Sequence, residues 1–82
     1  MAKRTERSSP VDFSFLLDSW PSRLVAREQV ADFSGGALNP KTCANWDSLS
    51  IGPKVRYRIG GKVVYDVLSL IEFMESRSER LG

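Results

Sequence analysis

The sequence contains no histidine and only one cysteine, Cys43, and these two scarcities exclude whole classes of site. A lone cysteine cannot form an intramolecular disulfide, and without histidine it cannot complete a familiar zinc site or a Cys-His nucleophile. Glycine occurs six times, but in no loop of the kind that cradles phosphate. We therefore expect a non-enzymatic protein without a cofactor or a metal, in which Cys43 is a small core residue.

Long apolar runs are also missing. No segment approaches the roughly 20 apolar residues that cross a membrane, and none follows the charged first residues as it would in a secretory signal. Nothing in the cysteine content points to an oxidising compartment, so we expect a cytoplasmic protein with no membrane partner. The 82 residues fit one domain, because a chain of this size buries only roughly 60% of its unfolded surface.

Basic charge is concentrated in one part of the chain. The formal net charge of the whole sequence is +2. Residues 39–65 contain one acidic residue, Asp47, and five basic residues, Lys41, Lys54, Arg56, Arg58 and Lys62. Five positive charges less one negative charge give +4, which leaves −2 for the rest of the chain. This segment is therefore a candidate anion-binding face, unless its charges serve solubility alone.

The first 21 residues differ from the rest of the chain in composition. Residues 1–10 are polar and charged without periodicity, which predicts a disordered basic arm. Residues 11–21 are apolar enough to predict an extension that packs either on the domain or on a partner subunit, and Pro21 ends any helix there. Residues 22–82 form the main domain.

Two short helices with a glycine-containing turn are predicted next. Apolar spacing places the first helix near Ala26–Phe33, after a short extended segment at Leu24-Val25. Ser34-Gly35-Gly36 ends this helix. Asn39 and Pro40 are predicted as the N-cap and first residue of a second helix that ends at Asp47. This outline is typical of a helix-turn-helix.

A β-hairpin is predicted to follow. Residues 55–59 alternate apolar and basic side chains, and Gly60-Gly61 is a turn signal. A two-residue loop would pair Ile59 with Lys62 and mix the two faces, whereas a three-residue loop would pair Ile59 with Val63. The separation of faces favours the three-residue loop. In that register the outer face carries Arg56, Arg58 and Val64.

The last predicted element is a closing helix with Asp66 as its N-cap. Its apolar stripe has helical spacing and consists of Val67, Leu70, Ile71, Phe73 and Met74. The glutamates at 72, 75 and 79 lie away from the stripe, which predicts a solvated face rather than paired carboxylates.

Four blocks of the sequence, in their order and spacing, resemble the MerR-like winged helix group of phage excisionases and AlpA-type regulators. They are LVAREQVA (24–31), GGALNPKT (35–42), GP (52–53) and RIGGKVVY (58–65), within a resemblance that covers residues 22–77. The resemblance implies a mainly α fold with a small β-hairpin, a winged helix-turn-helix with a closing helix. Residues 47–51 are more apolar and less basic than in similar sequences, and residues 11–20 lie outside the pattern.

For function, the resemblance implies sequence-specific binding of double-stranded DNA. The protein would act as a phage or mobile-element transcriptional regulator or as an excisionase-like architectural factor. Implied partners are double-stranded DNA, the protein itself as a dimer or cooperative multimer on DNA, and an integrase. The alternative is a protein-interaction adaptor that uses the same fold without DNA.

Eight residues are the candidates for DNA contact: Arg27, Asn39, Lys41, Thr42, Asn45, Arg56, Arg58 and Lys62. Donors on the second helix can reach base edges and phosphates of a major groove, while Asn39 serves first as the cap. Cations of the hairpin can bind phosphates or enter a minor groove. Their alternative role is to protect an edge strand from aggregation. Trp46 is expected in the core.

Overall fold

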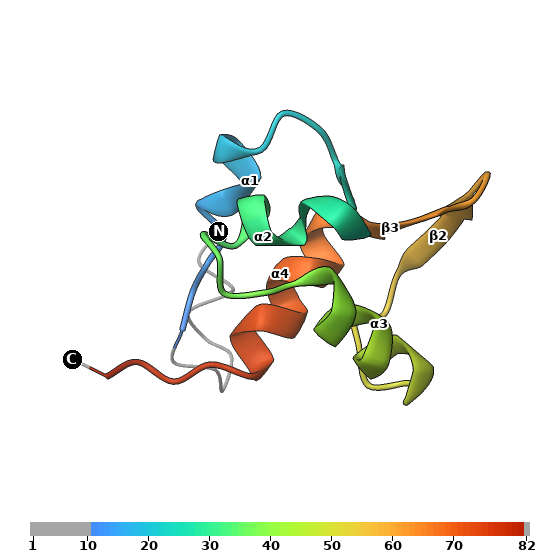
Figure 1. Cartoon of the computed structure of the whole chain (residues 1–82). Coiled ribbons are helices and arrows are strands. Elements are labelled where there is room, and N and C mark those ends of the chain that lie inside the picture. Colours follow the sequence, from blue (N-terminus) through green and yellow to red (C-terminus); the bar gives the residue numbers. More distant parts are fainter. Residues whose placement is uncertain (1–10, 82) are drawn as a thin grey trace.

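The computed structural model describes residues 11–81, so the predicted arm over residues 1–10 lies outside the described part of the chain. The described elements form a small α+β fold with a three-stranded antiparallel sheet (Figure 1). In chain order they are α1 (Leu16–Ser19), β1 (Leu24–Ala26), η2 (Arg27–Gln29), α2 (Val30–Phe33), α3 (Pro40–Ser48), β2 (Arg56–Ile59), β3 (Lys62–Asp66) and α4 (Val67–Ser76).

Capping residues set the ends of the longer helices. The Oδ1 of Asn39 accepts a hydrogen bond from the backbone N–H of Thr42 at 2.8 Å, and Pro40 opens α3. At α4 the side chain of Asp66 accepts from the backbone N–H of Ser69 at 3.1 Å. Both predicted N-caps are therefore confirmed. The first predicted helix is shorter than expected, because Ala26 belongs to β1 and residues 27–29 form a 3₁₀ turn before α2.

Helix α3 ends in a left-handed residue. Ser50 has a φ of 61°, its N–H donates to the carbonyl of Asp47, and the N–H of Ile51 donates to the carbonyl of Trp46. This is the hydrogen-bond pattern of a Schellman motif, in which glycine usually occupies the left-handed position. Serine there costs more than glycine would, because its Cβ crowds the following carbonyl.

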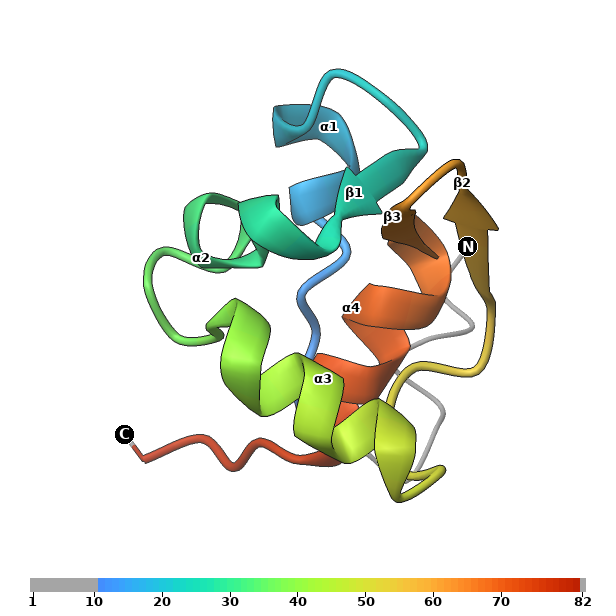
Figure 2. The ribbon, with the colours of Figure 1, turned by 45° about the vertical axis from the view of Figure 1, so that its right-hand side comes forward.

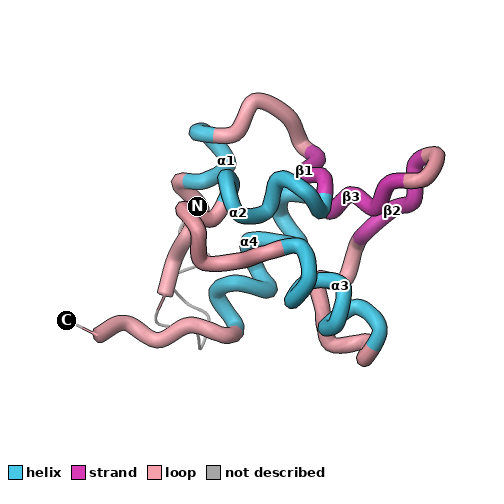
Figure 3. Tube along the Cα trace, viewed as in Figure 1, coloured by secondary structure: helices cyan, strands magenta, loops and turns pink. Residues whose placement is uncertain are grey.

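Strand β3 lies at the centre of the sheet, with β1 on one side and β2 on the other. Residue Val25 of β1 pairs with Tyr65, and both side chains are fully buried. All four residues of β2 are exposed, and the β2–β3 hairpin projects from the body of the molecule (Figures 1 and 3).

The predicted three-residue hairpin loop is wrong. Ile59 pairs with Lys62 and Arg56 pairs with Tyr65, so the loop consists of Gly60 and Gly61 alone. Gly60 has a φ of 61°, as the first central residue of a type II′ turn requires. The argument from separated faces failed because neither face of β2 is buried, and the turn geometry then decides the register.

The corrected register also corrects which side chains share a face. Directly opposed residues lie on the same side of a sheet, so Arg56 and Arg58 share the face of Tyr65. Val64, predicted on the outer face with them, lies on the opposite face and is buried.

Helix α4 runs through the middle of the molecule, and α3 lies beside its C-terminal half (Figure 2). The rings of Trp46 and Phe73 meet edge to face at 5.1 Å between centroids. The core is one cluster of buried residues: Val25, Val30, Phe33, Leu38, Cys43, Tyr65, Val67, Leu70, Ile71 and Phe73. Within residues 11–81, no helix combines the length and the apolar character needed to cross a bilayer.

Residues 11–20 pack on this core. The ring of Trp20 contacts Phe33 at 5.3 Å between centroids, and its indole N–H donates to the carbonyl of Leu24 at 3.0 Å. The backbone N–H of Phe13 donates to the carboxylate of Glu75 at 2.7 Å. Glu75 is only 5% exposed, which corrects the prediction that it lies on a solvated face. Its carboxylate is buried because the N-terminal extension covers it.

We expect Leu70→Ala to lower the free energy of unfolding by about 2–5 kcal/mol, because Leu70 is fully buried and truncation leaves a cavity. Leu68→Ala is the matched control on the same helix, since Leu68 is 37% exposed, and should cost about 1 kcal/mol or less. Urea denaturation followed by circular dichroism measures both values. Equal losses of stability in the two variants would contradict the placement of α4 in the core.

Candidate nucleic-acid interface

Helix α3 presents a polar face to solvent. At 100° per residue, Lys41, Asn45 and Ser48 fall on one side of the helix, and all three are exposed. Cys43 and Asp47 fall on the other side and are buried. The helix is therefore amphipathic, with an ammonium, an amide and a hydroxyl group available on its outer side.

A groove separates this helix from the β2–β3 hairpin. It has a volume of about 410 Å³, and its walls include Ala44 and Ser48 from α3 and Arg58 and Val63 from the hairpin. Figure 3 shows α3 and the hairpin on the same side of the molecule. The exposed guanidinium of Arg58 and the polar face of α3 thus border one surface.

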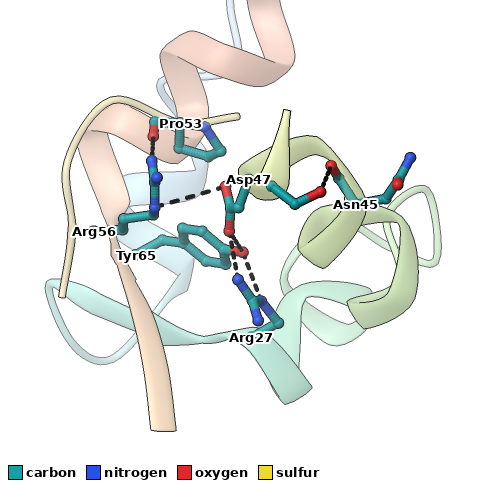
Figure 4. A network of polar contacts seen from close by, with 7 residues as sticks. Arg27, Asn45, Asp47, Pro53, Arg56 and Tyr65 are labelled. Atoms are coloured by element: carbon teal, nitrogen blue, oxygen red, sulfur yellow. Dashed lines mark hydrogen bonds and ion pairs between the residues drawn. The ribbon is translucent and has the colours of Figure 1, made fainter. Parts of the chain in front are cut away.

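A buried carboxylate lies at the floor of the groove. Asp47 of α3 is only 7% exposed in its side chain, and its Oδ2 accepts from Arg27 Nη2 at 2.6 Å. The same oxygen accepts from the Tyr65 hydroxyl at 2.6 Å. Arg27 Nε in turn donates to the Tyr65 hydroxyl oxygen at 3.0 Å, which closes a triangle of three side chains (Figure 4).

The second oxygen of this carboxylate is less well satisfied. Among residues 11–81, Asp47 Oδ1 receives no hydrogen bond, and Arg56 Nε lies 3.9 Å from it in an ion pair. Arg56 also donates through Nη1 to the carbonyl of Pro53 at 3.2 Å. The arginine therefore bends back across the groove floor toward the body of the protein (Figure 4).

Burial and the neighbouring carboxylate both affect the ionisation of this cluster. Burial, and then the hydrogen bond to Asp47, raise the pKa of the Tyr65 phenol well above its ordinary value. The hydroxyl therefore keeps its proton and donates it. Because the folded pKa is higher than the unfolded one, this contribution to stability is complete below the ordinary tyrosine pKa and is lost as the pH rises above it.

The eight predicted contact residues divide into three groups. Lys41, Asn45 and Arg58 are exposed: Arg58 lines the groove, and Lys41 and Asn45 lie on the outer side of α3. In Figure 4 the amide of Asn45 points away from the Asp47 cluster. Arg27 and Arg56, by contrast, form ion pairs with Asp47, and their side chains are 26% and 38% exposed.

The remaining predicted contacts have structural partners or lie at the margin. Lys62 forms an exposed ion pair with Glu28 of η2, on the opposite face of the hairpin from Arg58. Such exposed pairs contribute little to stability, so the lysine can exchange partners. Asn39 uses its side chain as the cap of α3, and Thr42 is half-buried at the edge of the polar face.

Sequence reasoning missed the central residue of this site. From the sequence, Asp47 was considered as the one negative charge of a basic segment and as the end of a helix, but not as a residue of the site. Its position four residues after Cys43, on the same helix, already placed it on the buried side of α3. A carboxylate in that position requires cationic or hydroxyl partners, and this requirement was the available signal.

Comparisons of the chain with protein-family models, with curated proteins and with solved structures found no match. The likeness to the excisionase and AlpA group therefore rests on the four sequence blocks described above.

The position of Gly52 generates a prediction about the cluster. A Cβ atom on Gly52 would lie 2.2 Å from Asp47 Oδ1, so Gly52→Ala must displace the carboxylate. We expect this variant to lower the free energy of unfolding by about 1–3 kcal/mol, the range for overpacked sites. In Gly61→Ala, the control, the new Cβ meets nothing within 4 Å and stability should stay within about 0.5 kcal/mol. Thermal unfolding measures both stabilities, and equal values for the two variants would contradict this explanation.

Proposed function

We propose that this domain binds double-stranded DNA as a winged helix-turn-helix, with α3 in the major groove and the β2–β3 hairpin as the wing. The observation that carries the proposal is the groove between the two elements, which Ser48 from the polar face of α3 and the exposed side chain of Arg58 both line. An α-helix fits into the major groove of DNA, and a hairpin that projects beside the helix can reach the neighbouring phosphate backbone.

The two elements supply different chemistry. Asn45 carries an amide, the group that pairs with adenine through two hydrogen bonds, on the outer side of α3. Lys41 in the first turn of α3 and Arg58 on the hairpin supply cations for phosphates. Helix contacts would give sequence choice, and the cations would give affinity and orientation.

The biological role that we propose follows the sequence resemblance. The protein acts as a regulator of phage or mobile-element transcription, or as an excisionase-like architectural factor, in the cytoplasm. It acts on DNA as a dimer or cooperative multimer, with an integrase as partner in the excisionase case. It is not an enzyme.

A second candidate function has one observation in its favour. An apolar groove of about 660 Å³ lies between α1, the α2–α3 connection and α4, and Phe15 at its rim is 63% exposed. Exposed aromatic surface of this kind suits a protein partner, as an adaptor would require. Heparin retention separates the two functions, because an adaptor has no reason to elute with a phosphate-like salt dependence.

The salt dependence of DNA binding tests the first proposal. We expect Arg58→Met to flatten the slope of log affinity against log salt by about 0.9 on a random-sequence duplex, the value for one lost phosphate contact. Arg23→Met is the matched control, because Arg23 precedes β1 at the end of the sheet away from the hairpin turn. Fluorescence anisotropy at several salt concentrations gives both slopes. A wild-type protein with no salt-dependent binding would refute the proposal.

Sequence choice tests the role of α3. We expect Asn45→Ala to cost about 1–3 kcal/mol on a duplex that the wild-type protein selects from a random pool, and to leave binding to random duplex unchanged. The substitution should not affect folding, since Asn45 is exposed and alanine suits a helix. Equal losses of affinity on both duplexes would contradict a role of α3 in base recognition.

A further inference from the structure

Two arginines, one of them in the basic segment, form ion pairs or hydrogen bonds with other side chains of the protein. Arg27 from η2 and Arg56 from β2 both end at the Asp47 carboxylate, and Tyr65 from β3 donates to the same group. One side chain of α3 thereby holds a 3₁₀ turn and two strands. The Asp47 side chain is buried, at 7% exposed, whereas the side chains of Arg27 and Arg56 are 26% and 38% exposed.

Two other cations of the basic segment have no such partners within the described part of the chain. Among the described residues, neither Arg58 nor Lys41 forms an ion pair or a hydrogen bond through its side chain. Arg56 and Arg58 are two residues apart on the same strand and the same face. Arg56 therefore has partners at the floor of the groove, in Asp47 and the carbonyl of Pro53, although its side chain stays partly exposed, while Arg58 has none among the described residues.

This difference affects DNA recognition because phosphate contacts carry no sequence information. Each added contact strengthens binding to every duplex alike and makes it more sensitive to salt. A protein that presented Arg27 and Arg56 as well would bind random DNA more tightly, and the ratio between specific and random affinity would fall.

We propose that Asp47 is a specificity-determining residue, which keeps Arg27 and Arg56 away from phosphates and so limits the sequence-independent part of DNA binding. This inference rests on the proposed function. Asp47 acts through the two arginines and does not itself touch DNA, so it is a positioning residue.

The first test is Asp47→Asn, which nearly preserves the shape of the side chain and removes its charge. We expect the salt slope on random-sequence duplex to steepen by about 1 to 2, as one or two arginines become free for phosphate. The ratio of affinity for a selected duplex to affinity for random duplex should fall. Asp18→Asn makes the same change in net charge on the exposed part of α1 and should leave both quantities unchanged.

A second pair of variants does not depend on the stability of Asp47→Asn. We expect Arg56→Met to leave the salt slope unchanged, because Arg56 is already occupied, while Arg58→Met flattens it by about 0.9. Both variants change one exposed strand in the same way and keep an apolar stem. Circular dichroism confirms folding of each protein before the titrations.

The outcomes separate the two proposals. Two outcomes overturn the role of Asp47 and leave DNA binding intact. The first is a folded Asp47→Asn protein that binds with the salt slope of the wild type. The second is an equal flattening of the slope in Arg56→Met and Arg58→Met. No binding to either duplex by the wild type and by Asp47→Asn overturns the proposed function and this inference together. A slope that steepens in Asp47→Asn but not in Asp18→Asn supports the inference.

Discussion

The contact between the Asp47 carboxylate and its donors adds polar links between α3, the 3₁₀ turn and the central strand to the apolar contacts of the core. Helix α3 reaches the 3₁₀ turn through Arg27 and the central strand through Tyr65, with both donors 2.6 Å from one oxygen. A buried carboxylate without partners would carry a large desolvation cost, so the fold must bring these groups together. The orientation of α3 relative to the sheet follows from that requirement.

Such a cluster is a means of orientation more than a source of stability. Replacing a whole buried ion pair with apolar side chains is often neutral or stabilising, whereas removing one partner costs about 3–5 kcal/mol. The cluster therefore penalises other arrangements of α3 and the hairpin without making the folded state unusually stable. A protein that places a helix and a hairpin on one surface benefits from that kind of constraint.

Features with a local physical cause could be predicted from the sequence. The start of α3 at Asn39-Pro40 and that of α4 at Asp66 depend on capping within four residues, and both are observed as expected. The hairpin register could not be predicted in the same way. Because β2 buries neither face, the order of apolar and polar residues along it does not favour one register over another. Turn geometry at two glycines decided it instead.

The candidate site was predictable to a similar extent. Exposed positions such as Lys41 and Asn45 follow from helical spacing, since a helix with one buried side must present the other to solvent. The pairing of Arg27 and Arg56 depends on Asp47 and on Tyr65, which belong to other elements of the fold. Counting charges along the chain cannot reveal a pairing that exists only after the elements assemble.

The two-glycine turn of the hairpin has a consequence for how this protein can change over time. Both glycines have open space around them, so residues can be added at the tip without meeting the rest of the chain. An insertion of two residues, one in each strand, would lengthen the hairpin and keep the existing pairs intact. A single inserted residue in β2 would instead rotate every side chain beyond it to the other face, including Arg58 if it fell before that position. The reach of the hairpin is therefore free to vary only in paired steps.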